Sequence, residues 1–405
     1  MTKISLILFI FTTSIFANML QDAIDKAPSG STLKLSSGVY KGNILINKPI
    51  TIIGKEPNVI IKGDNNSSVI TINSSYVTLK NLTISSSGSR LRELDSAIVI
   101  NNADYCEING CKIVDSLYGI FMNMVNHSSL QNNYITSKKT DISLRGNALK
   151  LYYSNHNVIK DNIIESSRDS TLTYSNNNTI KNNRFSDNRF ALHISLSDKN
   201  ILQENRFNYN SVGIMIMGAK DTTLTNNQIH SCTGAAGIGV VLKGVSNLVF
   251  EKNSVKYNAK GIYIDTKYNE VDIQRHIKNN EISYNKEAIN FQGLIKNNEI
   301  INNNFVGNID DIVKSSRGAL TRFNIIEYNY WDRYTGFDRD NDGTGDNQHK
   351  IYQYADQLWH YNNKVKFFYA SPAMSLLNFL SNLAPFVEPV LIIQDTKPAI
   401  NYLSL

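Results

Sequence analysis

The sequence "IKNNEI" occurs twice, at residues 277–282 and 295–300, and a variant, "IKNNRF", occupies residues 180–185. The shared unit is apolar–polar–Asn–Asn–polar–apolar, and it recurs as "LQNNYI" at 130–135 and "LTNNQI" at 224–229. Successive copies between residues 130 and 300 are 18 to 29 residues apart. Self-similarity at such an interval is typical of repeat architectures, in which each unit stacks on its neighbours.

A second unit precedes most copies, as in "ALHIS" (191–195), "GIMIM" (213–217) and "GIYID" (261–265). Each period therefore holds two or more short strands separated by polar turns, with no helical pattern long enough to cross over. We predict an all-β fold, a right-handed parallel β-helix with inward Ile, Leu, Val and Phe in columns. A β-propeller is the alternative, but it needs periods near 40 residues. Asn suits the recurring corner because it tolerates left-handed backbone and its amide can bond to neighbouring coils.

The two ends of the chain read differently from the repeats. Residues 1–17, "MTKISLILFIFTTSIFA", have one Lys before an apolar run, which predicts a secretory signal cleaved near Ala17. We expect the β-helix over 18–330, with a short helical cap at 19–27. Residues 331–405 form a C-terminal extension that holds an acidic loop and an amphipathic helix.

The predicted C-terminal helix begins near Ser371 and Pro372, which suit the N-cap and the first helical position. It is either a lid on the coil stack or a docking helix for a membrane partner. Its polar interruptions exclude a bilayer span. The apolar stripe that would contact the partner consists of Met374, Leu377, Leu380 and Leu383.

Charge and cysteine content add few constraints. The net charge of +6 on 405 residues does not indicate a nucleic-acid partner, and it is compatible with an acidic protein or a membrane surface. Cys106 and Cys111 would lie roughly 16 Å apart on an extended strand. Since a disulfide needs less than about 7 Å between Cα atoms, we expect no bond between them.

Several stretches resemble one known family. The segments "ALHISLSDKN", "GIMIMGAKDTTLTNNQI" and "NYWDRYTGFDRDNDGTGD" (329–346), with the C-terminal helix, are similar to NosD, the exported copper-site maturation proteins of nitrous oxide reductase. The resemblance implies a periplasmic, non-enzymatic protein that supplies copper, alone or with sulfur. Its partners would be an ABC permease and ATPase, a copper chaperone lipoprotein and apo nitrous oxide reductase. It would associate with the membrane peripherally, through the permease. The chain has no phosphate-binding loop of the G-x-x-x-x-G-K-[ST] type, so ATP hydrolysis must come from a partner.

Strand alternation suggests where copper would bind. In "ALHIS" and "GIMIM" the second and fourth residues should point inward, so His193, Met215 and Met217 should point outward. Coils about 4.8 Å apart would let these three side chains converge on one ion. Thioether and imidazole ligands suit Cu(I). The alternative is that the methionines pack under a loop and His193 is an isolated surface residue.

Two weaker copper candidates remain. The stretch "FMNMVNH" offers Met124 and His127, but its Met122 should point inward and pack in the core. The stretch "IHSC" offers His230 and Cys232 on one side of a strand. Cys106 and Cys111 fall in turn positions that Asn fills elsewhere, which indicates buried structural thiols.

The stretch "DRDNDGTGD" (338–346) resembles the first nine positions of a Ca²⁺ loop, with Gly343 at the sharp turn. His349 stands where an EF-hand would place a bidentate Glu, so the loop would need another closing ligand. The alternative is an acidic surface turn. The candidate calcium ligands are Asp338, Asp340, Asp342 and Asp346.

Two other function classes remain open. A β-helix can carry a polysaccharide lyase, hydrolase or epimerase, but glycoside hydrolysis needs two carboxylates about 5–9 Å apart. The predicted outward columns hold a single carboxylate, Asp265, which argues against an enzyme. A passive surface adhesin would leave the paired outward methionines unexplained.

Overall fold

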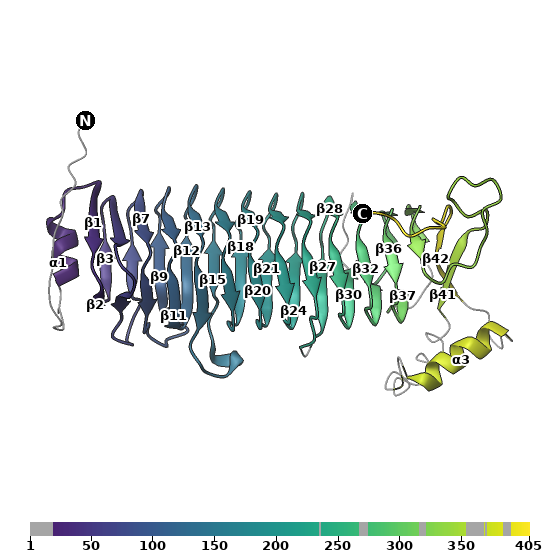
Figure 1. The fold of residues 1–405 in the computed structure, drawn as a ribbon, viewed down its shortest axis with the longest axis horizontal. Helices are drawn as coiled ribbons and strands as arrows, with labels where there is room; N and C mark the ends of the chain where they lie inside the picture. Colours follow the sequence, from purple (N-terminus) through teal and green to yellow (C-terminus); the bar gives the residue numbers. More distant parts are fainter. Residues whose placement is uncertain are drawn as a thin grey trace. The chain divides into compact units, whose positions relative to one another are not determined.

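The computed structural model describes residues 19–234, 236–266, 274–315, 321–353, 368, 371–383 and 390–405. The predicted signal peptide, residues 1–17, lies outside these ranges. The chain divides into two compact units, Met1–Ile214 and Met215–Leu405, called units 1 and 2 below. Each is a parallel β-solenoid, and together they contain about 12 turns. The predicted all-β parallel β-helix is therefore confirmed, with three strands per coil where the sequence indicated at least two (Figure 1).

In unit 1, three parallel sheets run along the solenoid, and each coil adds one strand to each sheet. The first sheet contains β1 (Ser31–Leu35), β4 (Ile50–Gly54), β7 (Val77–Lys80), β10 (Glu107–Asn109), β13 (Ser129–Gln131), β16 (Val158–Lys160), β19 (Thr179–Lys181) and β22 (Ile201–Gln203). The second contains β2 (Gly38–Lys41), β5 (Val59–Lys62), β8 (Thr83–Ser85), β11 (Lys112–Ser116), β14 (Tyr134–Ser137), β17 (Ile163–Glu165), β20 (Arg184–Ser186) and β23 (Arg206–Asn208). The third contains β3 (Ile44–Ile46), β6 (Ile70–Ile72), β9 (Ser96–Asn101), β12 (Tyr118–Asn123), β15 (Leu149–Tyr152), β18 (Asp169–Thr173) and β21 (Phe190–Ser195). A 3₁₀ turn, η1 (Ile142–Leu144), interrupts one coil.

In unit 2 the same three-strand coil continues. Its first sheet contains β25 (Thr223–Thr225), β28 (Leu248–Glu251), β31 (Arg275–Lys278), β35 (Asn298–Ile301) and β39 (Ile325–Glu327). Its second contains β26 (Gln228–His230), β29 (Ser254–Lys256), β32 (Glu281–Ser283), β36 (Asn304–Val306) and β40 (Tyr330–Trp331). Its third contains β27 (Ile238–Lys243), β30 (Lys260–Asp265), β33 (Glu287–Gln292) and β37 (Asp310–Lys314). The strand β24 (Val212–Met217) crosses the boundary between the units, and β34 (Ile295–Lys296) pairs with β38 (Thr321–Arg322).

The N-terminal end of unit 1 is covered by a helix, α1 (Met19–Lys26), as the sequence indicated (Figure 1). The helix buries its own Leu20 and Ile24 side chains. Gln21 fixes the helix to the exposed edge of β3: its Nε2 donates to the Leu45 carbonyl at 3.0 Å, and the Leu45 N–H donates to its Oε1 at 2.8 Å. The cap thus satisfies backbone groups that an open sheet edge would leave unpaired.

Buried asparagines hold successive coils together. In unit 1 the Asn133 N–H donates to Asn162 Oδ1, and the Asn162 N–H donates to Asn183 Oδ1, each at 2.9 Å. The Nδ2 of Asn133 also donates to the Ile108 carbonyl of the preceding coil at 2.9 Å. We call each column of bonded asparagines an asparagine ladder. The residue before each ladder Asn takes the left-handed backbone, as Asn132 does at φ 54°. The sequence suggested that one Asn supplies both the left-handed backbone and the bonds between coils. In the structure the first Asn of the pair takes the left-handed backbone and the second makes the bonds.

The structure corrects the repeat register near the two "IKNNEI" copies. Ile277 of the first copy pairs with Ile300, the last residue of the second. The Asn280 N–H donates to Asn303 Oδ1 at 2.9 Å, so the segment of the next coil that is equivalent to the first copy is 300–305. The 18-residue interval is therefore not a coil length. Asn298 bonds instead to Asn324, whose Oδ1 accepts from the Asn298 N–H at 3.1 Å.

After residue 331 the chain of unit 2 forms an antiparallel pair, β41 (His349–Gln353) with β42 (Val390–Asp395). The helix α3 (Pro372–Leu383) lies between them in sequence. Asp395 ends the asparagine ladder, because its Oδ2 accepts from Asn329 Nδ2 at 2.9 Å and from Trp331 Nε1 at 3.0 Å. The sequence reading predicted the helix but missed this strand pair.

Candidate functional site

The outward face of the third sheet carries the predicted side-chain columns. In unit 1, the register places Lys150 beside Thr171 and Thr171 beside His193. In unit 2, Val241 pairs with Tyr263 in the same kind of column, but the Val241 side chain is buried. The strand residues that alternate with these column residues are buried. Strand alternation therefore separates a packed inner face from a chemically variable outer face.

His193 lies on β21 with a half-buried imidazole. Its Nε2 atom is buried and has no hydrogen-bond partner among the described residues. Phe190 packs against the ring at 5.8 Å between centroids, and Arg189 is occupied by a bidentate contact with Asp169. Burial lowers the pKa of His193 from its ordinary value, which outweighs the opposing effect of the Asp169 carboxylate. The imidazole is therefore neutral near pH 7, and a neutral imidazole carries a lone pair on one of its two nitrogens.

Met215 and Met217 lie on β24, where their side chains are half-buried while Ile214 and Ile216 are fully buried. The two thioethers thus lie on the same outward face, about 6.6 Å apart along the strand. His193 belongs to unit 1 and both methionines belong to unit 2. Their convergence on one ion stays a prediction.

The weaker candidates separate in the structure. Met122 is fully buried, as predicted, and Met124 is exposed. His230 is half-buried, and its Nε2 lies 2.8 Å from Ser254 Oγ. Cys232 lies beyond the end of β26, fully buried, and its N–H donates to Asn258 Oδ1 at 2.9 Å. The expected placement of His230 and Cys232 on one strand side is therefore wrong, because the thiol occupies a ladder position in the turn.

Cys106 and Cys111 are buried, and no disulfide joins them, as predicted. The Cys111 N–H donates to Asn133 Oδ1 at 2.9 Å, so this residue takes the ladder position of an asparagine. Burial raises the pKa of both thiols to about 11. Neither is a thiolate at neutral pH, which makes them poor metal ligands.

The acidic loop of unit 2 gathers three carboxylates. One oxygen each of Asp338, Asp340 and Asp342 lies within 4.8 Å of the others. Asp340 has its pKa raised because it shares a hydrogen bond with Asp338 and faces Asp342. The side chain of Asp346 accepts from the Arg339 N–H at 3.1 Å, away from that cluster.

His349 does not close the acidic loop. It begins β41, and its ring packs at 5.2 Å from the Trp331 ring and at 5.7 Å from the Tyr334 ring. Burial lowers its pKa to about 4. The residue that stands in the sequence where an EF-hand has its bidentate Glu is thus a packing residue of the C-terminal strand pair.

The helix α3 exposes a row of apolar side chains. Leu377 and Leu380 of the predicted stripe are exposed, as are Leu376 and Phe379. The side chains of Met374 and Leu383 lie outside the described residues. Within the described parts of the chain, no helix is both long and apolar enough to cross a membrane.

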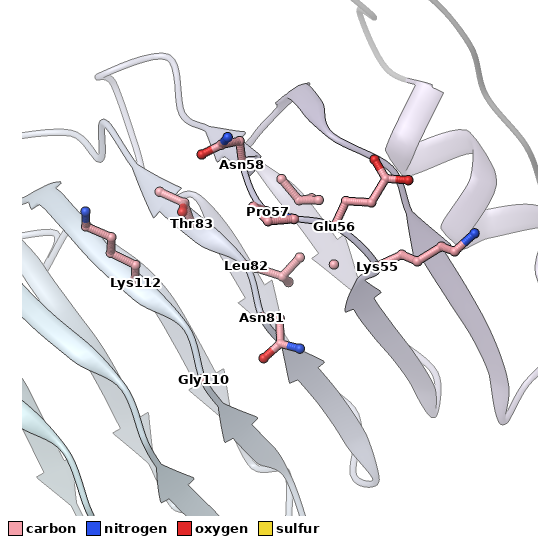
Figure 2. Close-up of a pocket in the computed structure, with 11 residues that line it drawn as sticks. Lys55, Glu56, Pro57, Asn58, Asn81, Leu82, Thr83, Gly110 and Lys112 are labelled. Atoms are coloured by element: carbon pink, nitrogen blue, oxygen red, sulfur yellow. The ribbon is translucent and has the colours of Figure 1, made fainter.

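A shallow cleft of about 390 Å³ lies over the N-terminal coils of unit 1 (Figure 2). Lys55, Glu56 and Lys112 give it mixed charge, and Asn58 and Asn81 supply amides. Its lining contains no histidine, methionine or cysteine, so it lacks the ligand types that suit Cu(I).

The chain is similar to one described protein family and to a curated relative. A family model described as "Periplasmic copper-binding protein (NosD)" matches residues 131–336, about half of the chain. A curated protein of Pseudomonas aeruginosa, "Probable ABC transporter binding protein NosD", is 23% identical over 393 residues. That alignment covers 90% of this chain and 87% of the relative.

Two solved structures show the same fold. The A-module of the mannuronan C-5 epimerase AlgE6 from Azotobacter vinelandii has a TM-score of 0.61 at 14% identity, over 75% of this chain and 91% of that one. The catalytic unit of a GH87 α-1,3-glucanase from Streptomyces thermodiastaticus has a TM-score of 0.54 at 15% identity, over 79% and 67%. At these identities the likeness concerns the fold alone.

Proposed function

The chain belongs to the NosD family of periplasmic copper-binding proteins, and from that premise we propose that it binds Cu(I) transiently and supplies it for the maturation of nitrous oxide reductase. The observation that carries the proposal is the family match over residues 131–336, which includes β21 and β24 with their outward imidazole and thioethers. The cargo is copper, alone or together with sulfur.

The proposed partners follow from a relative's description. The Pseudomonas aeruginosa protein is named as an ABC transporter binding protein. We extend that role to this chain, with a membrane permease and an ATPase as its complex, a copper chaperone lipoprotein as donor and apo nitrous oxide reductase as acceptor. The chain has no phosphate-binding loop, so the ATPase partner supplies the energy. No nucleic acid takes part. Export through residues 1–17 would place the protein in the periplasm.

His193, Met215 and Met217 are the proposed copper ligands. His193 contributes a neutral imidazole with an unpartnered nitrogen, and the methionines contribute two thioethers on one face. The sequence spacing of 22 residues gives His193 and Met215 equivalent places in successive repeats. Neutral, partly exposed ligands hold Cu(I) without a closed thiolate cage, which suits a protein that must pass the ion on.

A Cu(I) titration tests this site. The mature protein without an affinity tag is titrated anaerobically against a competing Cu(I) chelator, and the bound equivalents are counted. His193→Ala and the double variant Met215→Leu/Met217→Leu should each lose one equivalent. Met124→Leu, which removes an exposed methionine from a different turn, should keep it. Variants that retain every equivalent of the parent would exclude these ligands.

The competing function is carbohydrate chemistry, which β-helices of this shape support in the epimerase and the glucanase. Asp265 is the carboxylate of the proposed outward columns, half-buried at the end of β30. Glycoside hydrolysis requires a second one nearby. A parent protein that binds no Cu(I) but cleaves or epimerises uronate polymers would replace the copper function with this one.

We also propose that the acidic loop binds Ca²⁺ through Asp338, Asp340 and Asp342. Their oxygens already lie within 4.8 Å of one another, and hard carboxylates suit this ion. Asp346 would have to leave the Arg339 N–H to join them. Added Ca²⁺ should raise the thermal midpoint, and Asp340→Asn should abolish that rise. An equal rise in parent and variant would place the ion elsewhere.

The helix α3 is proposed to dock on the permease, which gives the protein a peripheral attachment to the membrane. Its exposed Leu377 and Leu380 are the described part of the contact stripe that also includes Met374 and Leu383. The double variant Leu377→Glu/Leu380→Glu should no longer co-purify with the permease and ATPase. Leu391→Glu, at an exposed leucine outside the helix, is the matched control. If the control variant lost the complex and the helix variant kept it, the helix would not be the contact surface.

A further inference from the structure

Two arginine side chains lie next to each other on the outward face of the second sheet in unit 1. Arg184 on β20 pairs in register with Arg206 on β23, and both residues are exposed. Neighbouring strands of a sheet are about 4.8 Å apart, so the two side chains leave the backbone at that separation. Like charges directly opposite each other in a sheet are destabilising. This pair of charges therefore opposes folding.

The protein itself does not neutralise these two guanidinium groups. Among the described residues, no carboxylate forms an ion pair with Arg184 or Arg206, and neither side chain donates a hydrogen bond. Two carboxylates near them have other partners: Glu165 accepts from a tyrosine hydroxyl at 2.5 Å, and Glu204 lies 3.5 Å from a lysine ammonium. Asp187, in the turn after β20, pairs with neither arginine. The donor groups of both arginines are therefore open to a ligand.

The strands beneath the two arginines are held in place by the core. Phe185 and Phe207 are the buried residues that follow them, and their rings stack at 4.9 Å between centroids with planes 7° apart. The backbone N–H groups of Arg184 and Arg206 each donate to a carbonyl of the preceding coil at 2.8 Å. The two side chains therefore start from fixed positions, which lowers the entropy cost of holding one ligand with both.

Two neutral polar residues extend the pair. Ser186 and Asn208 occupy the next outward positions, about 6.6 Å along β20 and β23, and they pair in register with each other. The Ser186 hydroxyl and the Asn208 Nδ2 donate to no described residue. The Oδ1 of Asn208 is buried, so Nδ2 is the end of this amide that a ligand would meet. The four side chains form a two-by-two array that is rich in hydrogen-bond donors.

The fold does not require arginine in this column. The preceding coil has Ile163 at the position of Arg184, and the coil before it has Tyr134. The column thus accepts apolar and aromatic side chains as well as charged ones. Two adjacent cations that repel each other, at positions where other coils use uncharged residues, break a local rule of sheet stability. Residues of this kind are candidates for function.

We propose that Arg184 and Arg206 together bind one tetrahedral oxyanion of the phosphate type, with Ser186 and Asn208 as additional donors. A guanidinium presents N–H groups in a planar fork that fits two oxygens of such an anion. A tetrahedral oxyanion offers an oxygen edge to each of the two forks, whereas a carboxylate has a single two-oxygen edge. This site lies on the second sheet and does not depend on the copper function proposed for His193 on the third.

The first test measures the binding of inorganic phosphate by isothermal titration calorimetry, at low ionic strength because salt screens exposed charges. We expect one phosphate per chain of the mature protein. Arg184→Gln and Arg206→Gln should each weaken binding about tenfold or more, since each removes a charge-assisted contact. Arg184→Lys keeps the charge without the fork and should recover only part of the affinity. The matched control is Arg92→Gln, at an exposed arginine in another turn of unit 1, which should bind phosphate like the parent.

A second measurement separates the two sources of such an anion, free phosphate and the phosphate of a lipid headgroup. The protein is floated in phosphate-free buffer with vesicles of phosphatidylcholine, with and without phosphatidylglycerol. Flotation that requires phosphatidylglycerol and is lost in both glutamine variants would identify the headgroup as the ligand. Phosphate binding without such flotation would identify the free anion.

The thermal midpoint without ligand distinguishes a binding role from a structural one. Each glutamine variant should melt at or above the temperature of the parent, because it relieves the repulsion between the two arginines. Added phosphate should raise the midpoint of the parent and not that of the variants. Glutamine variants that bind phosphate as tightly as the parent would overturn the proposal. A parent that binds neither phosphate nor the anionic vesicles would overturn it as well, as would a lower midpoint in both variants.

Discussion

Replacing Asn183 by alanine tests whether the asparagine ladder is what holds the coils together. The Asn183 Oδ1 accepts from the Asn162 N–H and from Asn162 Nδ2, each at 2.9 Å. Its Nδ2 donates to the Ile159 carbonyl at 2.9 Å, and to the Lys181 carbonyl and Asn205 Oδ1 at 3.0 Å. It is fully buried, so no bulk water is available to replace these bonds. Alanine removes all of these bonds at once and leaves the Asn162 N–H with no acceptor in its place.

The magnitude follows from these contacts. An unsatisfied buried donor costs about 1–3 kcal/mol, and each further lost hydrogen bond costs about 0.5–1.5 kcal/mol. One orphaned N–H, two bonds lost by the two hydrogens of Asn183 Nδ2 and one lost by Asn162 Nδ2 therefore predict a loss of about 2.5–7.5 kcal/mol in the free energy of unfolding. That is a large share of the stability of an ordinary domain.

Urea unfolding followed by far-UV circular dichroism measures the loss, and native-state hydrogen exchange shows whether protection falls in the coils around residue 183. The matched control is Asn182→Gly, one residue earlier, where the side chain is exposed and the backbone has φ 51°. Glycine keeps that conformation and should change stability by less than about 1 kcal/mol. A loss below about 0.5 kcal/mol for Asn183→Ala, or an equal loss in the control, would refute the ladder argument.

Three shorter predictions follow from buried groups. Asp395→Ala should destabilise unit 2 by about 2–4 kcal/mol in urea, because it orphans the buried indole N–H of Trp331 together with a ladder asparagine, and Asp395→Asn should recover most of the loss. Burial holds His349 neutral in the fold, with its pKa lowered to about 4, whereas the unfolded chain protonates near pH 6.5. The contribution of His349 to folding stability is therefore complete above pH 6.5 and should be lost as the pH falls from about 6.5 to 4. Over that pH range the thermal midpoint of His349→Phe should fall less than that of the parent. Cys106 and Cys111 should resist alkylation at pH 8 in the native protein and react after denaturation; fast native labelling would contradict their burial.

The sequence predicted the features that repeat, because repetition averages out local ambiguity. Strand alternation placed His193 outward and Met122 inward, as the structure does. The Asn–Asn corner also identified the ladder, although it did not show that the first Asn takes the left-handed backbone and the second makes the bonds. Both follow from local chemistry that is repeated in successive coils.

The remaining features depend on which residues pair between neighbouring coils, and a short motif does not specify that pairing. The second "IKNNEI" copy is identical to the first, yet Ile277 pairs with Ile300. The second copy begins with the short extra strand β34, and its Asn298 pairs with Arg275 and not with Asn280. Asp395 was missed for the same reason: it meets Asn329 across 66 residues of chain that do not repeat. The Arg184–Arg206 pair joins neighbouring coils and becomes visible only when the coils are superimposed.

The separation of scaffold from surface explains why a shared fold leaves function undecided. In each coil the inward apolar residues and the ladder asparagines are fully occupied by packing and hydrogen bonds, so they cannot also serve as ligands. Outward strand residues and exposed turn residues outside the ladder make fewer of these contacts and can vary without unstacking the coils. The epimerase module shares this fold at 14% identity, which is what independent surfaces on a common scaffold would produce. We therefore expect the chemistry of this chain in side chains that the solenoid does not need, such as the proposed ligand His193 on its third sheet.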